Sequence, residues 1–165
     1  MRNIFLILLL FAAGIFTNKA SAQAVILKTD TLEVSCSATD TFLVPVVLGN
    51  FTNVSGLQFT LHWDSLKLDY AFVTMIHPQF FGVGFDTTAA LLSSGNLTFA
   101  WTDLAGLSLP PNTVLFKVAF RRIGGSQTPI SFADFPTDIA AFNNQFNEIP
   151  VETFNGLIVP LDDSA

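Results

Sequence analysis

The side chains that could carry out catalysis or bind a metal ion are few in this sequence and are widely spaced. The two histidines, His62 and His77, lie in no His-x-x-x-His spacing and beside no pair of cysteines, so they form no zinc signature. The sequence contains no Gly-x-Ser-x-Gly turn, no glycine-rich phosphate loop and no dinucleotide fingerprint. We therefore expect a protein that is not an enzyme and that has no catalytic residues, no bound metal and no cofactor.

Carboxylates are more numerous, and the aspartates in the middle of the chain could supply a glycosidase pair or calcium ligands. They are Asp64, Asp69, Asp86, Asp103 and Asp134. Most of them fall at the end of an expected strand or in a turn, where aspartate commonly accepts hydrogen bonds from backbone amides. No Asp-x-Asp-x-Asp loop is present. A structural role is therefore the preferred interpretation, with a carboxylate pair and a calcium site as alternatives.

The first 22 residues have the organisation of a secretory signal peptide. Arg2 gives a positive start, an apolar run covers residues 4–16, and a small-residue cleavage site at 20–22 precedes Gln23. The apolar run is shorter than the roughly 20 residues that cross a bilayer, which disfavours a membrane anchor. We expect a bacterial protein that is secreted or displayed at the cell surface, with one domain over residues 23–160 and a polar tail over 161–165.

The charge balance limits the kinds of partner. Removing Arg2 and Lys19 from the seven basic residues leaves five basic residues against thirteen acidic ones. Nucleic acids and anionic membranes bind clustered Lys and Arg, so this balance argues against both as partners. Cys36 is the only cysteine, so it can form no internal disulfide, and its alternation with Val34 predicts a small buried residue rather than a reactive thiol.

Apolar residues at every second position organise most of the chain. The clearest alternations are Leu57, Phe59, Leu61 and Trp63 against Gln58, Thr60, His62 and Asp64; Leu97, Phe99 and Trp101 against Thr98, Ala100 and Thr102; and Val114, Phe116, Val118 and Phe120 against Leu115, Lys117, Ala119 and Arg121. A period of two indicates strands that turn one face to a core and the other to water. These strands recur with turn residues between them and without sustained helical spacing. The pattern predicts an all-β antiparallel sandwich of eight or nine strands with jelly-roll topology.

Other segments carry more local predictions. Residues 41–48 form an expected edge strand, because Pro45 would interrupt a central one. A break after Asp64 precedes a strand whose apolar residues are at even positions: Leu66, Leu68, Tyr70 and Phe72. The segment 77–86 is an expected loop whose aromatic side chains plug one end of the core: Phe80, Phe81 and Phe85. Three Asn-x-Ser/Thr triplets, at Asn50, Asn53 and Asn96, are interpreted as turn residues.

The two tryptophans raise the alternative of a carbohydrate-binding module, since exposed aromatic rows can stack on sugar rings. Trp63 and Trp101 share a face with Leu and Phe on their own strands. Side chains of that parity belong more often to a core than to a surface platform. We therefore expect both indoles to point inward and His62 to be a solvated strand residue.

The order of these features resembles the cohesin domain of bacterial cellulosome scaffolds and its cohesin-like relatives. The points of similarity are "FLVPVVLGNFTNVSGLQFTLHWDSLKLDY", then "GNLTFAWTD", "NTVLFKVAFR" and a last "FNGLIV". The resemblance implies a nine-stranded jelly-roll sandwich without catalysis, whose outer sheet face binds a dockerin module. The implied partner-binding residues are Gln58, Thr60, His62, Thr98, Ala100 and Thr102. Gly56 and Gln58 stand where type I cohesins typically have Asn and Asp.

The leading hypothesis is therefore a secreted, non-catalytic protein-binding module that docks a dockerin-type partner in extracellular assembly or polysaccharide degradation. A carbohydrate-binding module with a polysaccharide partner is one alternative. A structural or adhesive cell-surface domain is another. Apolar residues that are expected to point outward would serve that last role. They are Leu43, Val47 and those of the Phe-rich stretch 135–146.

Overall fold

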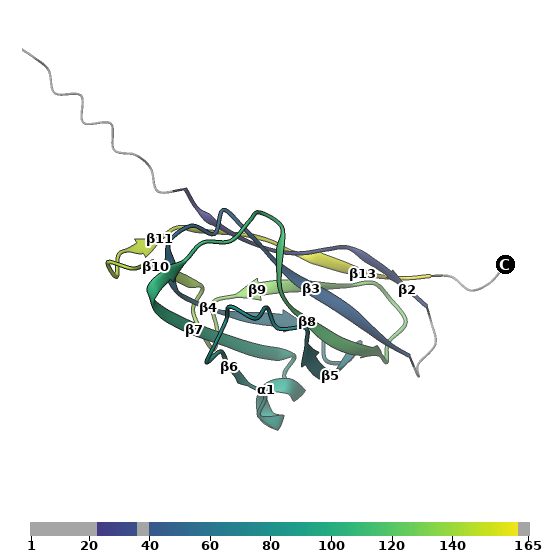
Figure 1. The fold of residues 1–165 in the computed structure, drawn as a ribbon. Helices are drawn as coiled ribbons and strands as arrows, with labels where there is room; N and C mark the ends of the chain where they lie inside the picture. The colour runs from purple at the N-terminus through teal and green to yellow at the C-terminus, as the bar shows by residue number, and fades with distance from the viewer. Residues whose placement is uncertain (1–22, 36–39, 162–165) are drawn as a thin grey trace, which may run out of the picture.

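The computed structural model describes residues 23–35 and 40–161 (Figure 1). The expected signal peptide, Cys36 and residues 162–165 of the expected tail lie outside the described residues. Within them the chain forms these elements: β1 (Val25–Thr29), β2 (Leu32–Val34), β3 (Thr41–Gly49), β4 (Val54–Trp63), β5 (Leu68–Thr74), β6 (Gly84–Asp86), α1 (Ala89–Ser93), β7 (Asn96–Leu107), β8 (Thr113–Arg122), β9 (Thr128–Ala133), β10 (Ala140–Asn143), β11 (Glu148–Ile149), β12 (Val151–Phe154) and β13 (Gly156–Pro160).

The strands form the two layers of a β-sandwich, which confirms the predicted fold class. One sheet has five strands in the order β12-β1-β3-β8-β5. The other has eight strands: β11-β10-β4-β9-β13-β2 form a path, with β7 paired to β4 and β6 paired to β7. In Figure 1 the long strands of both sheets run along the molecule, and the short helix α1 lies at one edge. No helix among the described residues is long and apolar enough to cross a membrane.

The first and last strands each pass from one sheet to the other. β1 pairs with β3 in the five-stranded sheet, whereas β2 pairs with β13 in the eight-stranded sheet. In the same way, β12 pairs with β1 in the five-stranded sheet, and β13 pairs with β2 in the eight-stranded sheet. Both of these pairings are parallel. Counting each interrupted strand once (β1 with β2, β9 with β10, and β11 to β13 together) leaves nine strands in the described chain. The other pairings are antiparallel, as the sequence predicted.

The predicted alternation builds an aromatic core between the sheets. Phe59 of β4 stacks on Phe99 of β7 with ring centroids 4.8 Å apart, and Phe99 stacks on Phe116 of β8 at 5.5 Å. Trp63 meets Phe120 edge-on at 5.0 Å. Each such pair adds about 0.5–1.5 kcal/mol to the free energy gained by burying the rings. The Phe99–Phe116 and Trp63–Phe120 contacts join the two sheets, and together the three contacts fix which face of β4 and β7 points outward.

The strand containing Pro45 is not an edge strand, which corrects the sequence prediction. β3 lies between β1 and β8 in the five-stranded sheet. Pro45 is opposite Lys117 of β8, and the pairing with β1 ends one residue away, at Val46. The strand is therefore locally an edge at Pro45, and a proline is tolerated there.

Bulges shift several residues away from their predicted faces. Val47 is only 4% exposed, although it lies outside the core cluster that contains Val46 and Leu48, whereas Leu43 is 39% exposed. The predicted break after Asp64 is a turn in which the Lys67 amide donates to the Asp64 carbonyl at 3.0 Å. A second irregularity, between Tyr70 and Phe72, was not foreseen and leaves Phe72 half-exposed. Leu66 lies in the turn and is also exposed rather than inward, while Leu68 and Tyr70 pack inward as predicted.

Two residues of β8 are buried against the sequence prediction, and one of them, Leu115, belongs to the core cluster. Leu115 and Ala119 are fully buried, although the alternation placed them in water. The His77 amide donates to the Leu115 carbonyl at 2.8 Å, which holds the segment after β5 against this strand. Ala119 stands opposite the larger Leu43 and Phe72 on its two neighbouring strands.

Two of the three aromatics of segment 77–86 plug the core, as predicted. Phe80 is buried against Trp101 with ring centroids 4.6 Å apart, and Phe85 packs on Phe116 at 5.0 Å. Phe81 instead points to solvent and is 82% exposed. Residues 84–86 of this segment form strand β6 rather than loop.

Candidate docking face

The outer surface of β4 and β7 brings the sequence-predicted partner-binding residues together. Gln58 is opposite Ala100 and Thr60 is opposite Thr98 in the antiparallel register. Thr102 is opposite Gly56, and His62 lies at the other end of the same row. β6 continues the surface beyond β7, with Gly84 opposite Ala100 and Asp86 opposite Thr98. We call this surface the docking face; it comprises Gln58, Thr60, His62, Gly84, Asp86, Thr98, Ala100 and Thr102.

Thr60 does not point into open solvent, which corrects the expectation for that residue. Its exposed fraction is 0%, because the loop formed by residues 134–139 folds over it. The Thr60 hydroxyl donates to the Thr137 carbonyl at 2.9 Å and accepts from the Thr137 amide at 3.0 Å. Thr60 therefore holds a loop instead of offering a free contact group.

The same loop also restricts Gln58. The Gln58 Nε2 donates to the Asp138 carbonyl at 3.3 Å, and Gln58 is half-buried. Inside the loop, the Ile139 amide donates to Asp134 Oδ1 at 3.0 Å. The β9–β10 loop is thus fixed to the sheet at two β4 side chains, and it covers Thr60 and part of Gln58 on the docking face. Ala100, Thr102 and His62 remain exposed, and Thr98 is half-buried.

Gly56 has an environment that explains its small size. A Cβ placed on Gly56 would lie 3.6 Å from Cδ2 of Phe142, which stands opposite on β10. That distance is an ordinary contact, so a methyl group fits, whereas a longer side chain would have to displace the ring. Gly56 therefore offers no polar side chain to the docking face, and the Phe142 ring lies beside it.

Several large apolar side chains of the described residues are highly exposed. Exposed fractions above 70% are found for Leu66, Phe81, Leu104, Phe135 and Phe146. Leu104 and Phe81 line a shallow pocket of about 440 Å³ together with Thr102 and Asp103. Sequence reasoning did not single out Phe81 or Leu104 as surface residues. Phe81 lies in a turn before β6, and Leu104 lies where the pairing of β7 with β4 is irregular, between Thr102 and Leu107, neither of which the alternation encodes.

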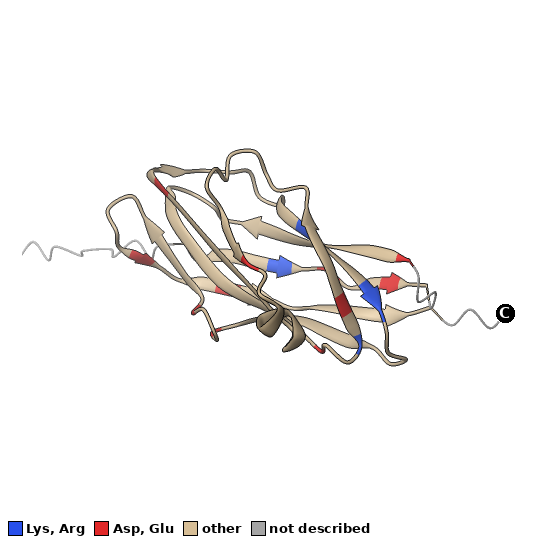
Figure 2. Ribbon diagram, turned by 90° about the horizontal axis from the view of Figure 1, so that it is seen from below, with Lys and Arg blue, Asp and Glu red and all other residues tan. Residues whose placement is uncertain are grey.

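Charge is distributed unevenly between the two sheets. The basic residues of the described chain lie on β1, on β8 and in the turn after β4: Lys28, Lys67, Lys117, Arg121 and Arg122. No strand of the eight-stranded sheet carries Lys or Arg within the described residues, and the β9–β10 loop contributes Asp134 and Asp138. Figure 2 marks the few basic residues in blue among the acidic ones in red. The surroundings of the docking face are therefore acidic.

The histidines and aspartates make mostly structural contacts. His62 is exposed, with Nδ1 2.9 Å from Asn96 Oδ1, and His77 packs edge-on against Phe80. Four of the five candidate aspartates accept a hydrogen bond from a nearby backbone amide: Asp64, Asp86, Asp103 and Asp134. Asp69 instead pairs with Arg121 at 2.8 Å. Within residues 23–35 and 40–161, no three His, Cys, Asp or Glu side chains form a group that could hold a metal ion.

Both indoles are inside, as predicted. Trp63 is 1% exposed and Trp101 is 3% exposed. A stacking platform for sugar rings needs exposed aromatic faces, so neither tryptophan can provide one. The carbohydrate-binding alternative loses the observation that suggested it.

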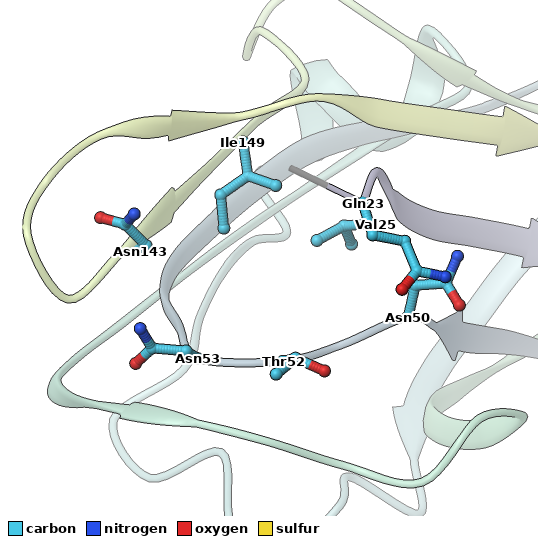
Figure 3. A pocket seen from close by; sticks show the side chains of 7 residues that line it. All are labelled: Gln23, Val25, Asn50, Thr52, Asn53, Asn143 and Ile149. Carbon is cyan, nitrogen blue, oxygen red and sulfur yellow. The ribbon is translucent and has the colours of Figure 1, made fainter. Parts of the chain in front are cut away.

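A second hollow of about 290 Å³ lies at the end of the sandwich, between the β3–β4 turn and the β10–β11 hairpin (Figure 3). Its lining is rich in amides and hydroxyls: Gln23, Val25, Asn50, Thr52, Asn53, Asn143 and Ile149. Asn50 and Asn53 have positive φ angles of 50° and 54°, which confirms their interpretation as turn residues. The Asn53 Nδ2 donates to Asn144 Oδ1 at 3.0 Å, so this amide ties the turn to the hairpin.

Comparison with known proteins identifies the fold. No protein-family profile matches the chain, and no curated protein sequence matches it. Among solved structures, the OlpA cohesin of Clostridium thermocellum, in complex with the dockerin Doc918, has a TM-score of 0.69 and 14% identity, covering 84% of this chain and 100% of that one. A non-cellulosomal cohesin from the archaeon Archaeoglobus fulgidus has a TM-score of 0.68 and 16% identity, covering 86% of this chain and 94% of that one.

A third similar structure is the cohesin CaCohA2 of Clostridium acetobutylicum, in complex with CaDoc0917. Its TM-score is 0.67 with 18% identity, and the match covers 84% of this chain and 100% of that one. The chain therefore has a cohesin-like jelly-roll fold, as its sequence resemblance implied.

Proposed function

We propose that this cohesin-like chain is a non-catalytic protein-docking module whose docking face binds a dockerin-type partner. The fold supports the proposal, since two of the similar structures are cohesins in complex with dockerins. Fold alone does not fix function, so the proposal also needs a surface suited to a macromolecule.

The observation that carries the proposal is the combination of exposed small side chains on β7 with exposed apolar side chains near them. Ala100 and Thr102 are exposed at the centre, and Leu104 and Phe135 are 76% and 80% exposed at the rim. Contiguous exposed apolar surface on a soluble domain commonly marks a protein-binding site.

The six residues named from the resemblance take different roles in this proposal. His62, Thr98, Ala100 and Thr102 would contact the partner directly. Thr60 and Gln58 would act mainly by holding the β9–β10 loop, whose exposed Phe135 then becomes part of the contact surface. The partner would therefore meet β7 and the β9–β10 loop rather than a flat sheet face.

The setting in which docking takes place is also part of the proposal. The leader at residues 1–22 supports export from a bacterial cell and a mature domain over residues 23–160. Outside the cell, a non-catalytic docking module would assemble other proteins, including enzymes that degrade polysaccharides.

Titration calorimetry tests this function. Residues 23–165 are mixed with each dockerin module encoded in the same genome, and at least one should bind with measurable heat. Ala100→Arg places a long charged side chain at the centre of the docking face and should abolish that binding. Glu152→Arg adds the same side chain at an exposed position of β12 on the other sheet and should bind normally. Failure of every dockerin to bind, or normal binding by Ala100→Arg, would refute the proposal.

A further inference from the structure

A third hollow, of about 290 Å³, opens on the five-stranded sheet, whereas the docking face belongs to the other sheet. It lies where β1 meets the ends of β3 and β12 and the turn before β8, and we call it the edge hollow. Its lining side chains are Ile26, Lys28, Asn50, Pro111, Asn112 and Phe154. The volume is at the lower end of the range for small-molecule sites, so it suits a ligand with a single ring.

Strand pairing explains how the edge hollow is built. β1 alternates between buried and half-buried residues, and Ile26 and Lys28 are the half-buried ones, so their side chains point away from the core. Lys28 is opposite Phe154 of β12, whose ring is 51% exposed. Ile26 is opposite Gly49 of β3, and a Cβ on Gly49 would lie only 3.1 Å from the Ile26 Cβ. A side chain at residue 49 would crowd Ile26, so glycine keeps this side of the hollow open.

Two hydrogen-bond donors lie side by side in the edge hollow. Lys28 Nζ donates to Asn112 Oδ1 at 2.9 Å. Because the carboxamide oxygen is the acceptor, the Nδ2 group of Asn112 is left beside the ammonium group as a second donor. The turn that carries Asn112 is closed by Thr113 Oγ1, which donates to the Pro110 carbonyl at 2.7 Å. Asn112 has a φ angle of 64°, which asparagine tolerates, so the donor pair is ordered before any ligand arrives.

The charge of Lys28 is not matched by an acidic side chain. The ion pairs among the described residues use Lys67 and Arg121, and no carboxylate of these residues lies within 4 Å of Lys28 Nζ. Glu152 is opposite Ile26 on β12 and does not line the hollow. Two adjacent donors, one of them charged, suit the two oxygens of a carboxylate, and charge-assisted hydrogen bonds of this kind are stronger than neutral ones.

The rest of the lining is apolar on one side and polar on the other. Ile26, Pro111 and Phe154 supply apolar surface. The Asn50 side chain has no hydrogen-bond partner among the described residues, and it also lines the amide-rich hollow of Figure 3. A purely apolar acid would leave this carboxamide unpaired. A saturated ring with hydroxyl groups at its edge would pack on Phe154 and still bond Asn50.

We propose that the edge hollow binds a sugar acid, that is, a pyranose ring that carries a carboxylate. The carboxylate accepts from Lys28 Nζ and Asn112 Nδ2, the ring packs on Phe154, and a hydroxyl group bonds Asn50. Acidic residues outnumber basic ones in the chain, so a long polyanion would be repelled. The ligand is therefore a single acid residue, either free or attached to a neutral glycan.

NMR titration of the mature chain, residues 23–165, tests this site with sodium glucuronate, glucose and benzoate. Glucuronate should give saturable shifts at the Lys28 backbone amide and at the side-chain amides of Asn50 and Asn112. It should bind at least about tenfold more tightly than glucose, which lacks the charge, and more tightly than benzoate, which lacks the hydroxyl groups. A xylo-oligosaccharide with one glucuronate branch distinguishes the sources, since tighter binding than free glucuronate indicates a glycan and equal or weaker binding a free sugar acid.

Variants separate the charge from the ring contact. Lys28→Gln should bind glucuronate no better than glucose, and Lys28→Arg should restore the preference. Lys117→Gln is the matched control, because Lys117 is on β8 of the same sheet, opposite Pro45, and does not line the hollow. It should bind glucuronate as the parent does. Phe154→Ala should weaken glucuronate and glucose alike, and the amide spectrum of each variant shows whether the fold is kept.

Several results would overturn the proposal. They are the absence of saturable shifts at the edge hollow, equal or tighter binding of glucose or benzoate, and full glucuronate binding by a folded Lys28→Gln protein. Because the hollow and the docking face are on different sheets, glucuronate should not change the affinity for a dockerin. A dockerin that displaces glucuronate would show that the edge hollow is part of a protein-binding surface instead.

Discussion

The Thr60 hydroxyl and the Thr137 backbone form a two-way hydrogen-bonded pair, although they are 77 residues apart in sequence. Thr60 Oγ1 donates to the Thr137 carbonyl at 2.9 Å and accepts from the Thr137 amide at 3.0 Å. Because Thr60 is fully buried and the two bonds are partly shielded from water, the pair fixes the β9–β10 loop on the sheet more firmly than an exposed contact would. The position of this loop decides which part of the docking face is open.

Thr60→Val is predicted to release the loop. Valine has nearly the same shape, but it leaves the Thr137 amide and carbonyl without their partner, which should cost about 1–3 kcal/mol of unfolding free energy. Chemical denaturation measures the loss, and amide hydrogen exchange at residues 134–139 should accelerate. Thr98→Val is the matched control, since the Thr98 hydroxyl has no hydrogen-bond partner among the described residues. Equal losses for the two variants would contradict the anchoring role.

Phe120→Asp is predicted to prevent folding. Phe120 is fully buried on β8, where it meets Trp63 at 5.0 Å and Phe42 at 6.2 Å. A carboxylate in that position would have no partner, so the chain would lose several kcal/mol of stability. Arg121→Gln, on the next residue, removes only an exposed ion pair worth about 0–1 kcal/mol. Circular dichroism melting should show a cooperative transition for Arg121→Gln and none for Phe120→Asp.

The glycine of the turn before β7 is predicted to be irreplaceable. Gly95 has a φ angle of 74°, and a Cβ on it would lie inside the contact distance of the Trp63 carbonyl oxygen. The Trp63 amide also donates to the Gly95 carbonyl at 2.9 Å, so the turn cannot move away freely. Gly95→Ala should therefore combine backbone strain with a steric clash.

Two other glycines separate these contributions. Gly82 has a φ angle of 69° and nothing within 4 Å of its Cβ position, so Gly82→Ala should cost only the backbone strain of about 1 kcal/mol. Gly125 has open space and no positive φ, so Gly125→Ala should be close to neutral. Denaturation midpoints should fall in the order Gly125→Ala, Gly82→Ala, Gly95→Ala. A Gly95→Ala protein as stable as Gly82→Ala would show that the turn can relax.

Sequence reasoning was accurate where a residue's environment is set by its own strand. Alternation in β4 and β7 placed Trp63 and Trp101 inside correctly, because both strands are long and regular over that stretch. It failed where distant segments or bulges intervene. Thr60 is covered by a loop from far along the chain, and Phe72 is turned outward by an irregularity in β5. The left-handed backbone of Phe146 was likewise not predictable, since the residue type disfavours it.

Alkaline pH is predicted to destabilise the protein through Tyr70. Desolvation by burial raises the pKa of the Tyr70 phenol above its ordinary value of 10.0, outweighing a hydrogen bond with the Val73 backbone that lowers it. Above pH 10 the unfolded chain therefore loses the phenol proton while the folded chain keeps it. Folding stability must then fall as the pH rises, because the folded state binds more protons.

Tyr70 is the only tyrosine in the chain, so phenolate absorbance reports on it alone. Titration of the folded protein should give a midpoint above 10.0, and titration in denaturant should return it to about the ordinary value. Tyr70→Phe keeps the ring beside Trp63, whose centroid is 6.3 Å away, and removes the ionisable group. The stability of this variant should therefore decline less between pH 10 and 11 than that of the parent. Identical declines would show that Tyr70 ionises as freely in the folded chain as in the unfolded one.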